Sequence, residues 1–233
     1  MQAVILAGGR GKRLRPYTTV LPKPLMPIGD FPILEIVVRQ LKKCGFNRII
    51  MAIGHQHQLF KAFFGNGKPW GLRIDYFIEK EPLGTAGALR HISGLDENFL
   101  MMNGDILTDL NYTTFMEFHR SRDSLLTIAT HERIQHVDYG TLKYNDDNIL
   151  QSFSEKPVLS FNVSMGIYAF SRAIAGFLTA EGRLDFPDLV VRLLELNRPV
   201  HCYHYKGYWM DIGRPDDYET AIDDFEKMKD HLL

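Results

Sequence analysis

Cysteine is scarce in this sequence of 233 residues, which contains only Cys44 and Cys202. Small secreted domains that rely on disulfides need several cysteine pairs, so two cysteines indicate a reducing compartment. A chain of this length buries roughly 70–75% of its unfolded surface and needs no covalent cross-links to fold. We therefore expect a cytoplasmic protein stabilised by an ordinary hydrophobic core.

Long hydrophobic runs are absent as well. No apolar stretch approaches the roughly 20 residues that a membrane-spanning helix requires. The apolar run at residues 3–7 is too short for the core of a signal peptide, and no basic residue precedes it. These absences predict a soluble protein that has no membrane partner.

A net charge of either sign is also missing, because 27 Lys and Arg residues are matched by 28 Asp and Glu residues. A duplex DNA-binding surface is broadly basic, so we expect no nucleic-acid partner. The distribution is nevertheless uneven, since residues 1–29 contain no acid. The basic residues of that stretch are Arg10, Lys12, Arg13, Arg15 and Lys23. This asymmetry is compatible with a small anion-binding site near the N-terminus.

Short apolar, β-branched runs alternate with amphipathic stretches in the first half of the chain, which is the pattern of β-α-β units. Strands are predicted at 3–7, 48–53, 72–78 and 99–102, and helices at 32–44, 56–64 and 85–92. The second half is richer in strands joined by short turns, which favours antiparallel additions. Its predicted strands are 124–130, 139–144, 149–154, 163–170, 201–205 and 208–212, and its predicted helices are 185–196 and 215–229.

This order of elements predicts a single α/β domain over residues 1–233. We expect a Rossmann-like, three-layer domain with a mixed, mostly parallel sheet and an antiparallel extension.

A glycine-rich basic loop is the most informative local feature. Residues 6–16 read Leu-Ala-Gly-Gly-Arg-Gly-Lys-Arg-Leu-Arg-Pro, directly after the first predicted strand. Glycines in this position let backbone N–H groups turn inward around an anion, and Arg13 adds a forked cation suited to phosphate. The spacing fits neither a Walker A loop nor the dinucleotide fingerprint. A flexible basic turn is the alternative, and the complete string makes it improbable.

Lys23 lies between two prolines, Pro22 and Pro24, which stiffen the backbone that carries it. A lysine held in a fixed direction suits the neutralisation of a phosphate. Taken alone, these residues are better explained as a proline-rich surface segment with an incidental lysine.

Two acids, Asp105 and Asp211, follow predicted strands that are far apart in the sequence. Ligands in open α/β sheets bind beyond the carboxyl ends of strands, so the two acids could meet across a cleft. Together with phosphates they would form a hard-oxygen site for Mg²⁺. Taken alone, each acid is better explained as a turn or helix-capping residue.

Together these stretches resemble the sugar-1-phosphate nucleotidylyltransferase family, whose members join a sugar phosphate to an NTP and release pyrophosphate. The resemblance extends over nearly the whole chain. The matching stretches are the glycine-rich loop and residues 22–24, 81–87, 103–105, 155–157 and 209–213. Residues 81–87 are most similar to guanylyltransferases of mannose-, heptose- or amino-sugar 1-phosphates, so GTP is the favoured nucleotide.

The resemblance implies a role for each matching residue and divides the domain into a mainly nucleotide-binding half, residues 1–110, and a mainly sugar-binding half, residues 111–233. Arg13 and Lys23 would be catalytic, and Asp105 and Asp211 would bind Mg²⁺. The implied nucleotide-binding residues are Leu6, Ala7, Gly8, Gly9, Gly11, Glu81, Gly84 and Thr85. The implied sugar-phosphate-binding residues are Gly140, Glu155, Lys156 and Ser164.

The chain departs from the family pattern in three places. Lys12 stands where Thr or Ser is usual, and Ser164 stands where many members have Asn. The carboxy-terminal left-handed β-helix of many members is not expected here, because the sequence ends soon after the Asp211 motif. A bifunctional acetylating enzyme is therefore not expected.

The predicted reaction is a Mg²⁺-assisted in-line displacement at the α-phosphorus, in which positioning and cation screening overcome the repulsion between phosphates. The expected partners are an NTP and a sugar 1-phosphate, and a homo-oligomer is possible. A member that uses UTP or dTTP and a catalytically silent regulatory module are the alternatives. A glycosyltransferase of related topology is disfavoured, because Ile106 follows Asp105 where an Asp-x-Asp metal motif would continue.

Overall fold

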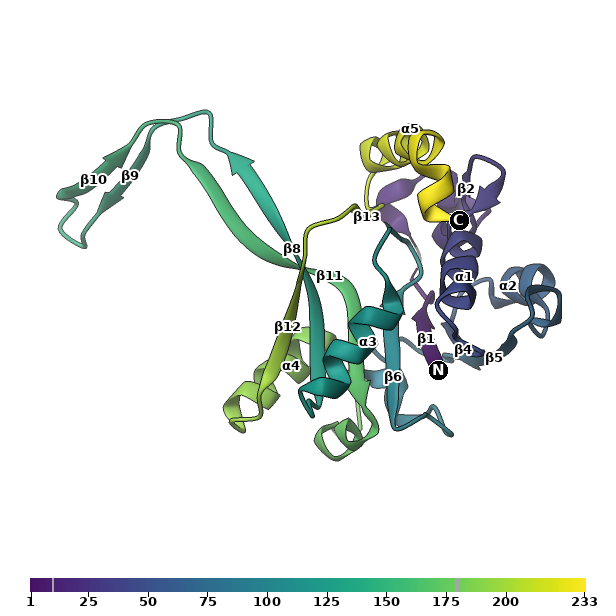
Figure 1. The fold of residues 1–233 in the computed structure, drawn as a ribbon. Helices are drawn as coiled ribbons and strands as arrows, with labels where there is room; N and C mark the ends of the chain where they lie inside the picture. Colours follow the sequence, from purple (N-terminus) through teal and green to yellow (C-terminus); the bar gives the residue numbers. More distant parts are fainter. Residues whose placement is uncertain (10, 179–180) are drawn as a thin grey trace.

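The computed structural model describes residues 1–9, 11–178 and 181–233, so Arg10 of the glycine-rich loop lies outside the described residues. A seven-stranded sheet forms its centre (Figure 1). In spatial order the strands are β12 (Val200–Tyr205), β8 (Leu126–His136), β11 (Val158–Ser171), β6 (Asn98–Asn103), β1 (Gln2–Leu6), β4 (Arg48–Ile53) and β5 (Arg73–Ile78). All are mutually parallel except β11, which confirms the predicted mixed, mostly parallel α/β sheet.

Helices cover both faces of this sheet because successive strand residues point to opposite sides. In β1, Ala3 and Ile5 pack into one core with α1 (Ile33–Lys43), α2 (His57–Phe64) and α3 (Tyr112–Ser121). Val4 points the other way, into a second core with α4 (Phe186–Glu195). The three predicted layers are therefore present.

A third, smaller core lies beyond the carboxyl ends of the central strands. It joins α5 (Pro215–Leu232) to two short ribbons, β2 (Pro27–Ile28) with β3 (Phe31–Pro32), and β7 (Ile106–Thr108) with β13 (Trp209–Asp211). The helix and ribbons lie over one end of the sheet (Figure 1). None of the helices in the described part of the chain is long and apolar enough to cross a membrane.

Three sequence predictions differ from the structure. Helix α3 was not predicted, although its N-cap Asn111 accepts a hydrogen bond from Thr114 N at 3.1 Å. The helix predicted at 85–92 is only a short 3₁₀ turn, Gly87–Arg90, because the preceding backbone is tied to residue 184. The strand predicted at 208–212 pairs with β7 as β13 and does not join the main sheet.

Strands β8 and β11 run further than predicted and leave the sheet as a two-stranded arm. Their pairing continues from Ser164 with Thr130 to Val158 with His136. A second ribbon, β9 (Thr141–Tyr144) with β10 (Leu150–Ser154), forms the tip. The arm projects from the body (Figure 1).

Candidate active site

A pocket of about 680 Å³ opens at the carboxyl ends of the central parallel strands, where ligands of open α/β sheets bind. The predicted residues that line it are Leu6, Ala7, Gly8, Gly9, Gly11, Arg13, Lys23, Gly84, Thr85 and Asp105. The structure thus brings together residues from distant parts of the sequence. Glu81, Asp211, Gly140, Glu155, Lys156 and Ser164 are not part of this lining.

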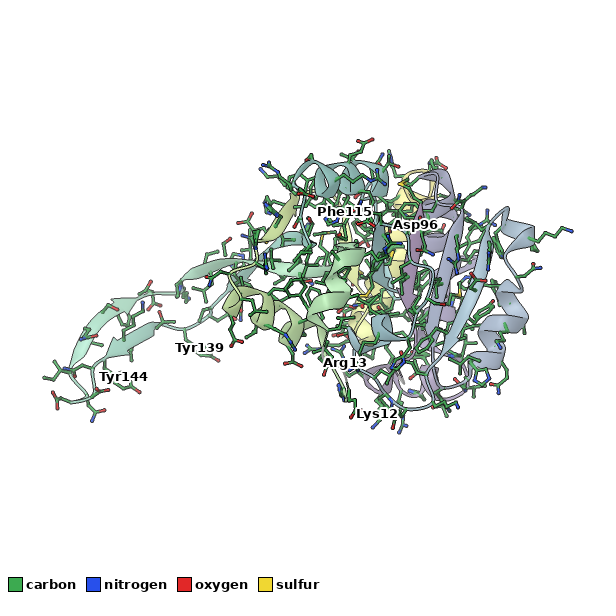
Figure 2. The ribbon with its side chains drawn as sticks, turned by 90° about the horizontal axis from the view of Figure 1, so that it is seen from below. Lys12, Arg13, Asp96, Phe115, Tyr139 and Tyr144 are labelled. Atoms are coloured by element: carbon green, nitrogen blue, oxygen red, sulfur yellow. The ribbon has the colours of Figure 1, made fainter. Side chains whose placement is uncertain are left out.

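The glycine-rich loop begins where β1 ends. Gly11 has a left-handed backbone with φ of 57°, and a β-carbon there would lie 3.0 Å from Thr18 Cγ2. The Thr18 hydroxyl also donates to Gly11 O at 2.7 Å, and this hydrogen bond holds the segment after the loop against Gly11. The buried Leu14 anchors the following turn, and Lys12 and Arg13 remain exposed on the body, well away from Tyr139 and Tyr144 of the arm (Figure 2).

Lys23 lies in a short 3₁₀ turn and is only 7% exposed. Its ammonium lies 2.6 Å from Asp105 Oδ2 and 3.8 Å from Asp211 Oδ1. The ribbon of β7 and β13 explains why these acids meet, because Ile212 N donates to Asp105 O at 3.4 Å. Lys23 is therefore not an incidental surface lysine, because such a residue would be exposed. A lysine is buried in this way only when carboxylates compensate its charge.

Burial raises the pKa of the Asp211 carboxyl, and the neighbouring charge of Asp105 raises it further. Lys23 and Arg13 oppose this shift without cancelling it. Carboxylate oxygens are hard ligands, so this pair of acids is suited to a divalent cation. Among the described residues no group of three or more His, Cys, Asp and Glu side chains could hold a metal, so any further ligands would come from substrate or water.

The loop at residues 82–87 forms the opposite wall and is pinned to the start of α4. Thr85 Oγ1 accepts from Phe186 N at 2.7 Å, and the backbone N–H groups of Ala86 and Gly87 both donate to Leu184 O at 3.0 Å. Gly84 is required here, because its φ is 85° and a β-carbon would lie 2.4 Å from Leu184 O. The pinning holds this wall of the pocket at a fixed position.

Glu79, not Glu81, is the glutamate that lines the pocket. Glu79 N donates to Ile53 O at 2.8 Å, which extends the pairing of β4 and β5 by one residue and leaves Glu79 at the pocket edge. The chain then bends, and Glu81 is exposed outside the lining. Burial raises the pKa of the Glu79 carboxyl, and a hydrogen bond from Leu83 N partly opposes the shift.

The residues assigned to the sugar by resemblance lie on the arm and at its base. Gly140 and Glu155 are neighbours, since a β-carbon on Gly140 would lie 3.0 Å from Glu155 Oε2. Lys156 follows them and is exposed. Ser164 lies at the base, where its hydroxyl donates to Tyr168 Oη and accepts from Gly166 N, both at 3.2 Å.

Sequence reasoning missed several residues of the lining besides Glu79. Arg183 and Asp185 reach the pocket from the segment before α4, and Asn103 reaches it from the end of β6. Asn103 had a usable signal because it stands two residues before Asp105 in the matching stretch 103–105. Arg183 and Asp185 had none, since only the long-range pinning of residues 82–87 brings them there.

The family model described as "Nucleotidyl transferase" matches residues 2–228. The chain belongs to this family. Among similar proteins, D-glycero-alpha-D-manno-heptose 1-phosphate guanylyltransferase of Aneurinibacillus thermoaerophilus is 34% identical, and the match covers 95% of this chain and 96% of that protein. UTP--glucose-1-phosphate uridylyltransferase of Synechocystis is 31% identical over 95% of this chain, which spans only 62% of that longer protein.

The solved structures agree with this assignment. The crystal structure of HddC from Yersinia pseudotuberculosis matches with a TM-score of 0.75 and 30% identity, covering 96% of this chain and 99% of that one. These matches confirm the predicted α/β fold. They also confirm the predicted family, the sugar-1-phosphate nucleotidylyltransferases, whose members are enzymes. Relatives in the family are named for guanylyl and for uridylyl transfer, so family membership leaves the nucleotide open.

Proposed function

We propose that this chain transfers the guanylyl group of GTP to a sugar 1-phosphate, giving an NDP-sugar and pyrophosphate. The observation that carries the proposal is the buried Lys23 with its ammonium 2.6 Å from Asp105 and 3.8 Å from Asp211, at the edge of a pocket lined by the glycine-rich loop. The nucleotide would lie mainly on residues 1–110 and the sugar mainly on residues 111–233.

In the proposed reaction an oxygen of the sugar phosphate forms a bond to the α-phosphorus of GTP as the bond to the pyrophosphate oxygen breaks. The nucleophile is already ionised near neutral pH, so no general base is required. The main obstacle is repulsion between the two anions, and fixed cations in a partly buried pocket reduce it. Lys23 would neutralise the phosphates at the point of attack, and Arg13 would stabilise the departing pyrophosphate.

Asp105 and Asp211 would hold Mg²⁺. The donor set fits, because both carboxylates converge on one point, the Lys23 ammonium, and carboxylate oxygens are the hard ligands that Mg²⁺ binds. When bound, the ion would screen phosphate charge and polarise the α-phosphate. The protein residues supply the orientation, since Lys23 is held in place from a stiff, proline-flanked turn.

Guanine is favoured by Glu79. Guanine presents two adjacent N–H donors on its Watson–Crick edge, and one carboxylate can accept both, whereas uracil and thymine present a single N–H flanked by carbonyl oxygens. Glu79 Oε1 would lie 3.6 Å from a β-carbon on Gly8, so the carboxylate faces the loop that would cradle the nucleotide. UTP and dTTP remain the competing nucleotides.

One assay tests the proposal, namely pyrophosphate release from a matrix of GTP, UTP, dTTP and ATP against mannose, heptose, glucose and amino-sugar 1-phosphates, with Mg²⁺. We expect release with GTP and one class of sugar 1-phosphate. Release only with UTP or dTTP would overturn the choice of nucleotide, and nucleotide binding without release would favour a regulatory module.

A further inference from the structure

The arm lacks a core of its own. Every residue from 131 to 164 lies in the described part of the chain, and none of them is buried. A two-stranded ribbon is at best marginally stable in water unless a further element covers one of its faces. The arm therefore needs a partner surface.

The ribbon at the tip presents one apolar face. Its register places Leu142 opposite Phe153 and Tyr144 opposite Leu150, so these four side chains share one face. They are 55%, 60%, 65% and 57% exposed, respectively. The other face carries the polar residues Thr141, Lys143, Ser152 and Ser154. Such alternation is typical of a sheet that packs one face against protein.

The apolar surface on the arm is large enough for a stable interface. Beyond those four residues, the arm exposes Ile134, Tyr139, Ile149, Val158, Leu159 and Phe161. Ten side chains at these exposures, distributed over both faces of the arm, present on the order of 1,000 Å², against about 800 Å² per partner in a standard interface.

The base of the arm is fastened in the extended direction, which disfavours closure onto its own pocket. The Arg133 guanidinium lies 5.2 Å from the centre of the Trp209 ring, and the His131 ring lies 5.5 Å from it. Trp209 Nε1 donates to Met165 O at 3.0 Å, and His131 Nε2 is 3.1 Å from Gly207 O. Folding the arm back would break these contacts.

We propose that two copies of this chain exchange arms, so that the arm of each packs its apolar face on the other and brings Glu155 and Lys156 to the other copy's pocket. The arm leaves the sheet at the carboxyl end of β8, the same edge at which the pocket opens. A twofold axis at this edge lets each arm reach the other site. Val20 and Tyr17, which follow the glycine-rich loop and are 78% and 53% exposed, provide apolar surface there.

Light scattering during size-exclusion chromatography tests the dimer. We expect twice the chain mass of 26.8 kDa for the wild type, and a single-chain mass for the double variant Leu142→Ser with Phe153→Ser. The matched control on the opposite face, Lys143→Ser with Ser152→Thr, should remain a dimer. Circular dichroism checks that each variant is folded. If the double variant does not fold, Phe153→Ser alone replaces it, and we expect that single variant to form a weaker dimer than the wild type. A monomeric wild type, or a double variant that stays dimeric, would overturn the proposal.

A mixing experiment tests the shared site, and this part rests on the proposed function. Asp105→Asn disables the pocket, and Lys156→Asn removes the arm's cation while suiting the left-handed backbone at φ of 42°. After subunit exchange of equal amounts, half of the dimers are mixed and one of the two sites in each is intact, so about one quarter of wild-type activity should return. If each arm serves its own pocket, no activity returns, and the exchange is refuted.

The two proposals fail in different ways. If the wild type releases no pyrophosphate with any substrate pair, the proposed function fails, and the masses of the wild type and the two double variants still decide the arm contact. If the wild type is active and dimeric but mixing restores nothing, the reaction stands and the shared site is wrong.

Discussion

Replacing Glu79 by Gln is the sharpest test of how the pocket selects its nucleotide. Glu79 lines the pocket, whereas Glu81, two residues further along, is exposed outside it. The same substitution at Glu81 is therefore a matched control for net charge and for the loop. Only the Glu79 variant should change the preference for GTP.

The size of the effect follows from the surroundings of Glu79. Leu83 N donates to Glu79 Oε2 at a long 3.4 Å, and the glutamine carbonyl can accept the same bond, so the loop should stay in place. What is lost is the charged acceptor for guanine, a bond worth about 1.5–3 kcal/mol when fully desolvated. Because Glu79 is only half-buried, we expect about 1.5 kcal/mol, or roughly a tenfold loss in kcat/KM for GTP.

Steady-state pyrophosphate release with GTP and with UTP measures this selectivity. Glu79→Gln should lower kcat/KM for GTP about tenfold and leave or improve the value for UTP, while Glu81→Gln should change both less than about twofold. Equal losses with both nucleotides, or a larger loss from Glu81→Gln, would refute the assignment of Glu79 to the base.

Three further predictions concern other parts of the molecule. Lys23→Met leaves two carboxylates without their ammonium and should lower the free energy of unfolding in urea by about 2 kcal/mol. The loss is smaller than for a fully buried pair because one acid is half-exposed. An unchanged midpoint of the urea unfolding curve would contradict this prediction. Gly84→Ala should raise the KM for nucleotide severalfold and lower Tm more than the control Gly45→Ala does. Both glycines have φ near 80°, but only at Gly84 would the added β-carbon meet a backbone atom, Leu184 O, at 2.4 Å. Burial lowers the pKa of His119 to about 4, so the unfolded chain takes up a proton first as pH falls below 6.5. Between pH 7 and pH 5 the free energy of unfolding should fall by about 2 kcal/mol more in the wild type than in His119→Gln. An equal fall in both proteins would show that His119 does not titrate on unfolding.

The main sheet and the glycine-rich loop were predictable because their signals are local. Buried parallel strands read as continuous apolar runs, as in residues 3–7, and glycines after a strand mark a turn with special backbone angles. Lys23 and the two acids were also identified from sequence, although their meeting was only a conjecture. The pairing of β7 with β13, which joins them, involves segments about 100 residues apart.

Other features depended on tertiary contacts that no local pattern reveals. Glu79 lies in the pocket because the pairing of β4 and β5 continues one residue past the apolar run. Residues 85–92 look helical but are tied to Leu184 instead. Helix α3 is different, because the cap at Asn111 and the spacing of its buried residues were readable signals that were overlooked.

The arm was underestimated because its strands lose their apolar pattern. After Thr130 the sequence continues with His131, Glu132 and Arg133, which does not resemble a strand with one buried face. The pairing nevertheless continues to His136, since cross-strand hydrogen bonds do not require a buried side chain. A strand of this kind is stable only if the apolar side chains further along find another surface, which agrees with the proposed exchange of arms.

Pyrophosphate release by Asp105→Asn and Asp211→Asn tests most directly whether the Lys23 cluster is the catalytic centre. Asp96→Asn is the matched control, because Asp96 precedes the amino end of β6 whereas Asp105 follows its carboxyl end. With GTP, the preferred sugar 1-phosphate and Mg²⁺, both cluster variants should lose about 100-fold or more in kcat while keeping a near-normal Tm, and the control should match the wild type. Near-normal release from both cluster variants would contradict a catalytic centre at Lys23, Asp105 and Asp211.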